Sequence, residues 1–300
     1  MVPLRVSSSP GGAGIRPSLL IACLLILLTL GAAGAHLQAT SAELSRFNPG
    51  WNGTAAFFSL SESLGAVIHS PNVAPHDQPD RYILIAPDGT DAEPIVRGVL
   101  AAGGIVIIAD EDGGANELLE ALGLEMRIRP GNVSSVDMEF ASPRTVRATV
   151  SSNHSVLQGV ETLVFNRPSS IEGGEPLVRT SVLSWIDHDG DGSPGSGEEL
   201  GRYTLMASEK SEIGDVILIA DASLFASTMQ QVRRLHDNQR LLFNLLDSDS
   251  VMVDAMYGRP ADADGPAYLV HTVKSAPISS IIVIFLLMMV VAFAFRRQIL

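Results

Sequence analysis

The apolar positions in the middle of the chain come in short, continuous runs separated by polar turns. The runs at 82–86 (YILIA), 105–109 (IVIIA) and 215–220 (DVILIA) lack the alternation of a half-exposed strand. Uninterrupted runs of this length are typical of strands covered on both faces. The segments 95–102 and 116–122, each followed by a glycine, predict helices between such strands. This alternation predicts an α/β fold with a mostly parallel sheet and helices on both of its faces.

The pattern changes between residues 131 and 203, where turn-rich stretches separate short strand-like segments and no strong helix intervenes. These segments lie at 144–150, 161–165, 177–184 and 202–208. Strands that follow one another without crossover helices pair antiparallel. We therefore expect an antiparallel extension of the sheet.

Helical patterns flank this region on both sides. Residues 55–64 predict a helix that Thr54 could cap, and a short strand follows at 66–69. Residues 224–231 and 238–246 predict two further helices, with leucines on one side of the second.

Two uncharged apolar runs lie near the chain ends, at 19–35 and 278–295. At ~1.5 Å of rise per residue, each approaches the roughly 30 Å of a bilayer core. Basic residues flank both runs, at Arg16 and at Arg296, and such residues stay on the cytoplasmic side. The pattern predicts a protein of the cell membrane with cytoplasmic termini and most of the chain outside. The first run also fits a signal peptide cleaved after Ala35.

These observations divide the chain into seven expected segments. They are a cytoplasmic tail (1–18), a transmembrane helix or signal peptide (19–35), a linker (36–50), an exterior α/β domain (51–249), a juxtamembrane stalk or edge strand (250–277), a transmembrane helix (278–295) and a second cytoplasmic tail (296–300). Three N-x-S/T sequons between residues 52 and 155 agree with an exterior location.

The charge of the chain is concentrated in its middle. The sequence has 33 acidic and 20 basic residues, and four of the arginines lie in 1–35 and 276–300, which contain no acid. Residues 36–275 therefore have 33 acids, 16 bases and a net charge of −17. This excludes nucleic-acid binding, which requires a basic surface. The single cysteine, Cys23, lies in an apolar run, which excludes an intrachain disulfide and a thiol nucleophile in the polar part.

One loop matches D-x-[DN]-x-[DN]-G-x5-E, the spacing that wraps oxygen ligands around calcium. The five candidate ligands are Asp187, Asp189, Asp191, Ser193 through its carbonyl, and Glu198. A proline follows Ser193, and the segment entering the loop resembles a strand, so a paired EF-hand is not expected. The alternatives are a structural calcium clip and an acidic, Gly/Pro-rich hairpin turn without metal.

A second set of candidate residues lies where expected strands end. In an open α/β sheet, ligands bind at the carboxyl ends of the strands. Asp88, Asp110 and Asp221 follow strands, and three polar residues could approach the same edge: Asn52, Thr54 and Asn238. The alternatives are helix caps, a ligand site and a hydrolytic acid–base pair. As a cap, Asp221 would contribute ~1 kcal/mol.

Three segments carry a family resemblance: 47–64, 82–109 and 214–246. They resemble an uncharacterised archaeal and bacterial family of membrane-anchored proteins, whose domain of unknown function is shaped like class I glutamine amidotransferases. They are also similar to gliding-motility-type ABC-transporter auxiliary proteins. The resemblance implies a flavodoxin-like sheet and work beside an ABC exporter or a MoxR-type ATPase assembly. Amidotransferases use a cysteine nucleophile, which this sequence lacks outside its first apolar run.

Two functions follow as expectations. The first is a non-enzymatic, membrane-anchored accessory or scaffold domain in a transport or ATPase-linked assembly. The second is an exterior ligand-binding or hydrolytic domain that uses the strand-end carboxylates. A deep polar pocket joining Asp88, Asp110 and Asp221 favours the second function, whereas side chains consumed by helix caps favour the first.

Overall fold

The computed structural model describes most of the chain between residues 41 and 258. The described residues are 23–31, 34, 41–70, 78–129, 131–211, 213–232, 235–258, 268–269 and 272. The chain divides into a unit of residues 38–271 and a second unit made of 1–37 with 272–300. The elements that position the candidate sites belong to the first of these units.

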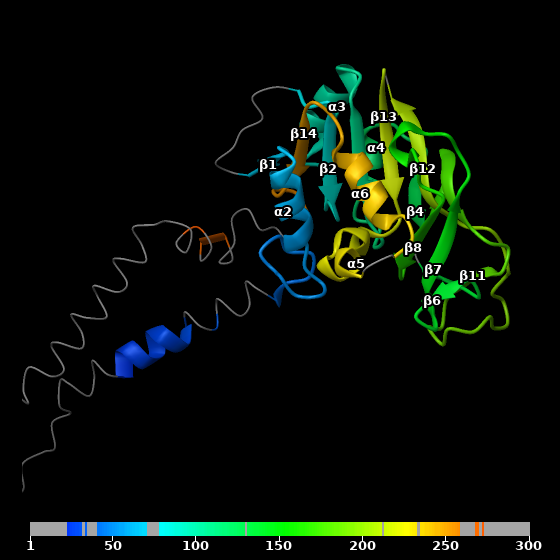
Figure 1. The fold of residues 1–300 in the computed structure, drawn as a ribbon, viewed down its shortest axis with the longest axis horizontal. Helices are drawn as coiled ribbons and strands as arrows, with labels where there is room; N and C mark the ends of the chain where they lie inside the picture. The colour runs from blue at the N-terminus through cyan, green and yellow to red at the C-terminus, as the bar shows by residue number, and fades with distance from the viewer. Residues whose placement is uncertain are drawn as a thin grey trace, which may run out of the picture. The chain divides into compact units, whose positions relative to one another are not determined.

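Among the described residues, ten strands form one mixed sheet (Figure 1). Five strands form its parallel half, in the spatial order β1 (Val67–His69), β14 (Val251–Asp254), β2 (Arg81–Ile85), β3 (Ile105–Ala109) and β13 (Gly214–Ile219). The register aligns Ile107 of β3 with Ile83 of β2 and with Ile217 of β13. All three strands therefore end at one level and present the residues that follow them at a common edge.

The other half of the sheet is antiparallel. It contains β12 (Thr204–Ser211), β10 (Glu175–Thr180), β7 (Ser142–Val150) and β6 (Met138–Glu139), and β8 (Thr162–Asn166) pairs with β7. Two small ladders accompany this half: β5 (Asn132–Ser135) with β11 (Ser184–Asp187), and β4 (Arg127–Arg129) with β9 (Ser170–Glu172).

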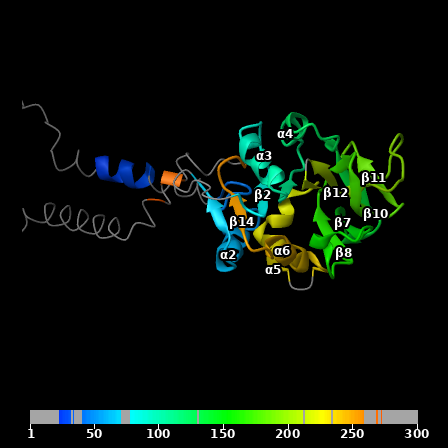
Figure 2. The ribbon, with the colours of Figure 1, turned by 90° about the horizontal axis from the view of Figure 1, so that it is seen from above.

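Helices cover both faces of the parallel half, as Figure 2 shows. On one face lie α3 (Glu93–Ala101) and α4 (Asn116–Ala121), and on the other lie α2 (Ala55–Ser63), α5 (Ser227–Gln231) and α6 (Asn238–Leu246). Successive strand residues point to opposite faces, so Tyr82 and Leu84 pack in the core beneath α3 and α4, whereas Ile83 and Ile85 pack on the side of α2 and α6. This double coverage explains why the strand runs are apolar at every position.

Three expected elements differ in the structure. The helix expected at 224–231 is a 3-10 turn, η2 (Ala222–Phe225), followed by α5, because Ala226 between them has an extended backbone. The strand expected at 177–184 ends at Thr180, and β11 begins at Ser184. Residues 251–254, expected in a stalk or edge strand, form β14, which is fully buried between β1 and β2.

The prediction of flanking transmembrane helices is not supported. No helix in the described part of the chain is long and apolar enough to cross a membrane. The expected span 278–295 lies outside the described residues, and 19–35 is described only at 23–31, which is helical, and at 34. The predicted fold class was therefore wrong in its membrane helices, and so was the placement at a membrane with an exterior domain and cytoplasmic ends. The described fold is a mixed α/β sheet in which strands predominate.

Candidate functional site: an acidic cleft at the strand ends

A cleft of about 770 Å³ opens where β2 and β3 end. Polar and acidic side chains dominate its wall, which consists of Ala42, Glu43, Leu44, Trp51, Ala86, Asp110, Glu111, Asp112, Asn132, Asn166, Arg167 and Ser223. We call this cavity the acidic cleft. Its position at the carboxyl ends of parallel strands is the usual place for ligands in such sheets.

Asp110 supports the wall of the cleft. The side chain is buried, and its two carboxylate oxygens accept hydrogen bonds from the backbone N–H groups of Asp112 (3.0 Å) and Ala115 (2.9 Å). Burial raises the pKa of Asp110, and these hydrogen bonds partly oppose the rise. Because both oxygens are engaged, Asp110 holds the turn that leads into α4.

Glu111, which is half-buried, and Asp221, which is fully buried, form a carboxyl pair beside the cleft. Asp221 is fully buried, and its oxygens accept hydrogen bonds from the Asn166 backbone N–H (2.7 Å) and the Ser223 hydroxyl (2.6 Å). Glu111 Oε2 accepts a bond from the Ala222 N–H (2.7 Å). Burial and the neighbouring charge of Asp221 raise the pKa of Glu111 to about 8, and burial also raises the pKa of Asp221. The pKa is raised further at Glu111 than at Asp221, so the pair retains a proton at a higher pH than isolated carboxyl groups would.

The rim of the cleft has unusual backbone geometry. Six described residues other than glycine have a positive φ, and three of them line the cleft: Leu44 (55°), Ala86 (46°) and Arg167 (55°). Such left-handed conformations cost roughly 1–2 kcal/mol each for residues with a Cβ, and they cluster at functional sites. The Arg167 side chain is exposed, and in the described part of the chain it makes no hydrogen bond or ion pair. Trp51, which is 70% exposed, adds an aromatic surface to the rim.

The six residues that we expected together at one edge of the sheet do not all line the cleft. Only Asp110 lines the cleft, and Asp221 lies behind Glu111. Thr54 donates its hydroxyl hydrogen bond to the Leu44 carbonyl (2.8 Å) and does not cap α2, so that cap prediction was wrong. Asp221 precedes η2 without a side-chain capping bond, so its cap prediction was wrong as well.

The three remaining predicted residues lie outside the cleft wall. Asn52 accepts a hydrogen bond from the Asn48 amide (2.9 Å) and holds the segment before α2. Asp88 is exposed, and its backbone N–H donates to the Tyr257 carbonyl (3.2 Å). Asn238 connects the start of α6 to β8. Its side-chain amide accepts a hydrogen bond from the Val164 N–H (2.9 Å) and donates one to the Val164 carbonyl (2.7 Å).

Sequence reasoning missed Glu111, Asn166, Arg167 and Trp51. Glu111 had a signal, since three consecutive acidic residues follow the apolar run 105–109. Asn166 and Arg167 lie after an antiparallel strand, and their approach to β3 depends on long-range packing that has no local pattern. Trp51 lies within the family-like segment 47–64, but nothing in that segment indicates that its ring faces a cleft.

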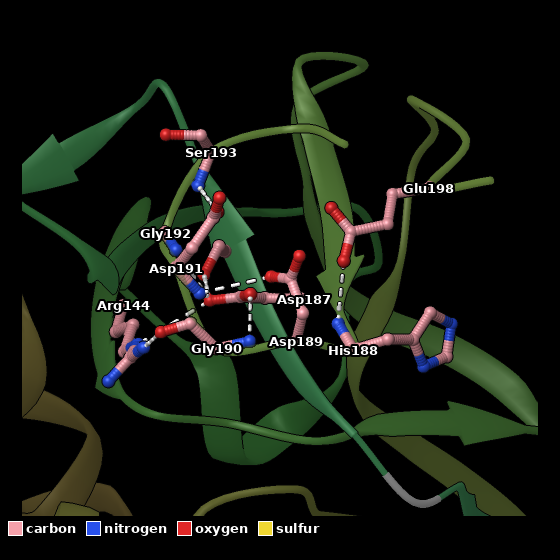
Figure 3. Close-up of polar contacts among 10 residues, drawn as sticks. Arg144, Asp187, His188, Asp189, Gly190, Asp191, Gly192, Ser193 and Glu198 are labelled. Atoms are coloured by element: carbon pink, nitrogen blue, oxygen red, sulfur yellow. Dashed lines mark hydrogen bonds and ion pairs between the residues drawn. The ribbon is translucent and has the colours of Figure 1, made fainter. Parts of the chain in front are cut away.

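The loop with calcium spacing forms a compact acidic turn (Figure 3). One carboxylate oxygen from each of Asp187, Asp189 and Asp191 lies within 4.8 Å of the others, an arrangement that could hold a metal ion. Asp187, buried at the end of β11, accepts bonds from the backbone N–H groups of Gly190 (2.8 Å) and Gly192 (3.2 Å). These bonds coil the loop around the three carboxylates.

Glu198 and Ser193 sit differently from the three aspartates. Glu198 accepts hydrogen bonds from the backbone N–H groups of His188 (2.7 Å) and Gly195 (2.8 Å), which lower its pKa. Its carboxylate would have to leave one of these bonds to join a metal. Ser193 donates its backbone N–H to Asp191 (2.7 Å), and the hydroxyl points away from the cluster (Figure 3). The three aspartates offer the oxygens of a cation site. Asp187 already accepts bonds from Gly190, Gly192 and the Arg144 guanidinium (3.4 Å), so Asp187 and Glu198 would both have to rearrange to bind an ion.

Comparison with known proteins gives one family match. Residues 46–246 match the model described as "Domain of unknown function (DUF4350)". No curated protein matches the sequence. The match agrees with the resemblance to an uncharacterised family that the sequence segments indicate.

Several solved structures show distant likeness. The mmIFT52 N-terminal domain has a TM-score of 0.38 at 13% identity, covering 63% of this chain and 81% of that one. A putative ThuA-like protein from Bacteroides uniformis ATCC 8492 has a TM-score of 0.29 at 12% identity, covering 57% and 70%. A beta-galactosidase from Bacillus circulans sp. alkalophilus has a TM-score of 0.30 at 10% identity, covering 50% of this chain and 21% of that one. Likenesses this weak carry no argument about activity.

Proposed function

We propose that this chain, which belongs to the DUF4350 family of domains of unknown function, binds a small, polar, neutral or cationic molecule in the acidic cleft. The observation that carries the proposal is the position of Glu111 in the wall of an open cleft, where burial and the charge of Asp221 raise the pKa of its carboxyl group to about 8. A protonated carboxyl is a hydrogen-bond donor, a role that an ionised carboxylate cannot perform.

The charge of the wall selects the class of ligand. Glu43, Asp110, Glu111 and Asp112 line the cleft together with one arginine, Arg167. When Glu111 is protonated, three carboxylates and one guanidinium remain, so the wall keeps a negative charge. Such a wall repels anions and favours neutral or cationic molecules.

Hydrogen-bonding groups from separate segments of the cleft wall give the site its specificity. Glu111 Oε2 is held by the Ala222 N–H, whereas Oε1 has no hydrogen-bond partner in the described part of the chain. Arg167 offers further donors, and the Trp51 ring offers an apolar face. A polar molecule with acceptor oxygens and one apolar face, such as a sugar or an amino sugar, matches these groups.

Tryptophan fluorescence tests this proposal directly. The chain has two tryptophans, and Trp185 is 2% exposed whereas Trp51 is exposed at the cleft. Titration with glucose, glucosamine and putrescine, and with glutarate as the anionic comparison, should change the Trp51 emission for at least one neutral or cationic probe. Trp51→Phe should remove the signal.

Substitutions at position 111 provide the matched control. Glu111→Gln keeps an N–H donor and should retain binding, whereas Glu111→Ala should lose it at unchanged melting temperature. For a neutral probe, the affinity of the wild type should fall as pH rises through about 8, where Glu111 loses its proton, and in Glu111→Gln it should not. Tighter binding of glutarate than of every other probe, or equal binding by Glu111→Ala, contradicts the proposal.

An accessory role beside an ABC transporter or a MoxR-type ATPase stays a prediction from the resemblance, as do an archaeal source and a link to gliding-motility-type proteins. Affinity purification of the full chain from its source organism tests the accessory role. Recovery of a stoichiometric ATPase or permease would support it, and recovery of the chain alone would contradict it.

A second proposal concerns the loop from Asp187 to Glu198. The proximity of three aspartate oxygens and the full match to calcium spacing favour a structural calcium clip held by Asp187, Asp189 and Asp191, the Ser193 carbonyl and Glu198. Calorimetric titration with calcium should give saturable heat in the wild type and none in Asp189→Asn/Asp191→Asn. An absence of heat at millimolar calcium would contradict the proposal of a calcium clip.

A further inference from the structure

A second cavity, of about 580 Å³, lies in the antiparallel half of the domain. Its wall includes three arginines from separate segments: Arg129 ends β4, Arg179 lies in β10, and Arg202 precedes β12. We call it the arginine cavity. It shares no lining residue with the acidic cleft.

The arginines of this cavity are poorly neutralised by the protein. Glu172, the one acidic residue of the wall, forms an ion pair with Arg129. In the part of the chain that the structure describes, Arg179 and Arg202 make no hydrogen bond and no ion pair through their side chains. The side chains of the cavity wall thus have a net charge of +2, although residues 36–275 together have a net charge of −17.

Arg179 is the least satisfied of the three. Its side chain rises from the middle of the antiparallel half, where its residue pairs with Thr204 of β12 and Thr149 of β7. The Nε atom is buried without a hydrogen-bond partner. A buried donor without a partner costs free energy. The terminal N–H groups of the same guanidinium have no hydrogen bond among the described residues and can donate to a ligand.

We propose that the arginine cavity binds a small oxyanion, of the phosphate or sulfate type, alone or as an ester. Guanidinium groups bind such oxygens through paired N–H donors, and Arg179 and Arg202 have these donors available. The hydroxyl groups of Ser170 and Thr204 line the same wall, whereas the Tyr203 hydroxyl already donates to the Glu199 carbonyl (2.8 Å). The surrounding negative charge disfavours an extended polyanion, so the ligand is a compact one.

Calorimetry on the full chain tests this inference at constant ionic strength set with sodium chloride. The probes are inorganic phosphate, sulfate and glycerol 3-phosphate, and poly-glutamate serves as the polyanion comparison. The wild type should bind an oxyanion saturably. Arg202→Gln, a change at an exposed position, should weaken that binding at least about tenfold, the loss of one charge-assisted contact. Arg179→Gln should do the same, and Arg179→Lys should recover part of the affinity.

Arg97→Gln is the matched control, because it removes one positive charge from an exposed arginine that pairs with Glu93 on α3. It should leave oxyanion binding unchanged. Tighter binding of glycerol 3-phosphate than of phosphate supports an ester ligand, and equal binding supports the free ion. The inference is overturned if no probe binds saturably, if Arg202→Gln binds like wild type, if Arg97→Gln weakens binding equally, or if poly-glutamate binds tightest. These outcomes are independent of ligand binding in the acidic cleft, where the lining residues are different.

Discussion

The parallel and antiparallel halves of this sheet place opposite charges in their cavities, and they do so by different structural means. In the parallel half, β2 and β3 end at one level, and the residues that follow them converge, which brings Asp110 and Glu111 into one acidic wall. In the antiparallel half, Arg179 belongs to a strand and reaches its cavity from the face of the sheet. The first arrangement buries carboxyl groups and shifts their pKa values, whereas the second leaves two guanidinium groups without a partner among the described residues. A domain with a strongly negative net charge can therefore still offer one site for neutral or cationic molecules and one for anions.

Of the substitutions that test this contrast between the two halves, Asp221→Ala in the parallel half should change the free energy of unfolding most. The substitution removes the acceptor of the Asn166 N–H and the Ser223 hydroxyl and leaves these donors without a partner. We expect a loss of roughly 3 kcal/mol in the free energy of unfolding, more than the ~1 kcal/mol of a helix cap. Urea denaturation measures the loss, with Ser223→Ala as the milder control. A loss of 1 kcal/mol or less would show that the hydrogen bonds of Asp221 contribute little to the stability of the fold.

The next effect is the pH dependence of stability that Glu111 produces. Its pKa is higher in the folded chain than in the unfolded one, so the folded state binds more protons and stability falls as pH rises. The fall should run from the unfolded value near 4.5 to the folded value of about 8. We expect it to amount to roughly 2 kcal/mol, less than full burial would give, because the cleft admits water.

Glu111→Gln isolates this contribution, since the amide does not titrate in this range. Denaturation curves at pH 5 and pH 8 should differ clearly more in the wild type than in Glu111→Gln. Parallel pH profiles for the two proteins would show that Glu111 has an ordinary pKa.

The smallest effect is expected in the antiparallel half and has the opposite sign. Arg179→Met removes a guanidinium whose Nε is buried without a partner and keeps the apolar stem of the side chain. We expect stability to stay equal or rise by about 0.5–1 kcal/mol, because no protein partner is lost. A thermal melt in phosphate-free buffer measures this. Destabilisation by more than 2 kcal/mol would mean that Arg179 serves the fold and not a ligand.

The sequence predicts the parallel half better than the antiparallel half, for a physical reason. The runs 82–86 and 105–109 are apolar throughout, and the structure has β2 and β3 there within one residue. The segment of β14 was expected only as a stalk or edge strand, because VMVD is too short to distinguish a buried central strand from an edge strand. In the antiparallel half, the break between β10 and β11 depends on a change of pairing partner from β12 to β5, which the local pattern does not record.

The candidate sites divide in the same way. Asp110 was predictable because strand ends converge in a parallel sheet. Glu111 was predictable only as its neighbour, since its raised pKa depends on Asp221, which lies 110 positions further along the chain. Nothing in the sequence distinguishes three arginines from ordinary exposed charged residues: Arg167, Arg179 and Arg202. Their lack of partners appears only once every nearby carboxylate has been placed.

The ionisation of Glu111 is the central claim for the acidic cleft, and it can be measured by following the side-chain carboxyl carbon resonance of ¹³C-glutamate-labelled protein against pH. The resonance is assigned by its absence in Glu111→Gln. We expect a titration midpoint of about 8 for this carboxyl group in the free protein. A midpoint near the ordinary value of 4.5 would contradict the account, because Glu111 would then be ionised at neutral pH and could not donate a hydrogen bond to a ligand.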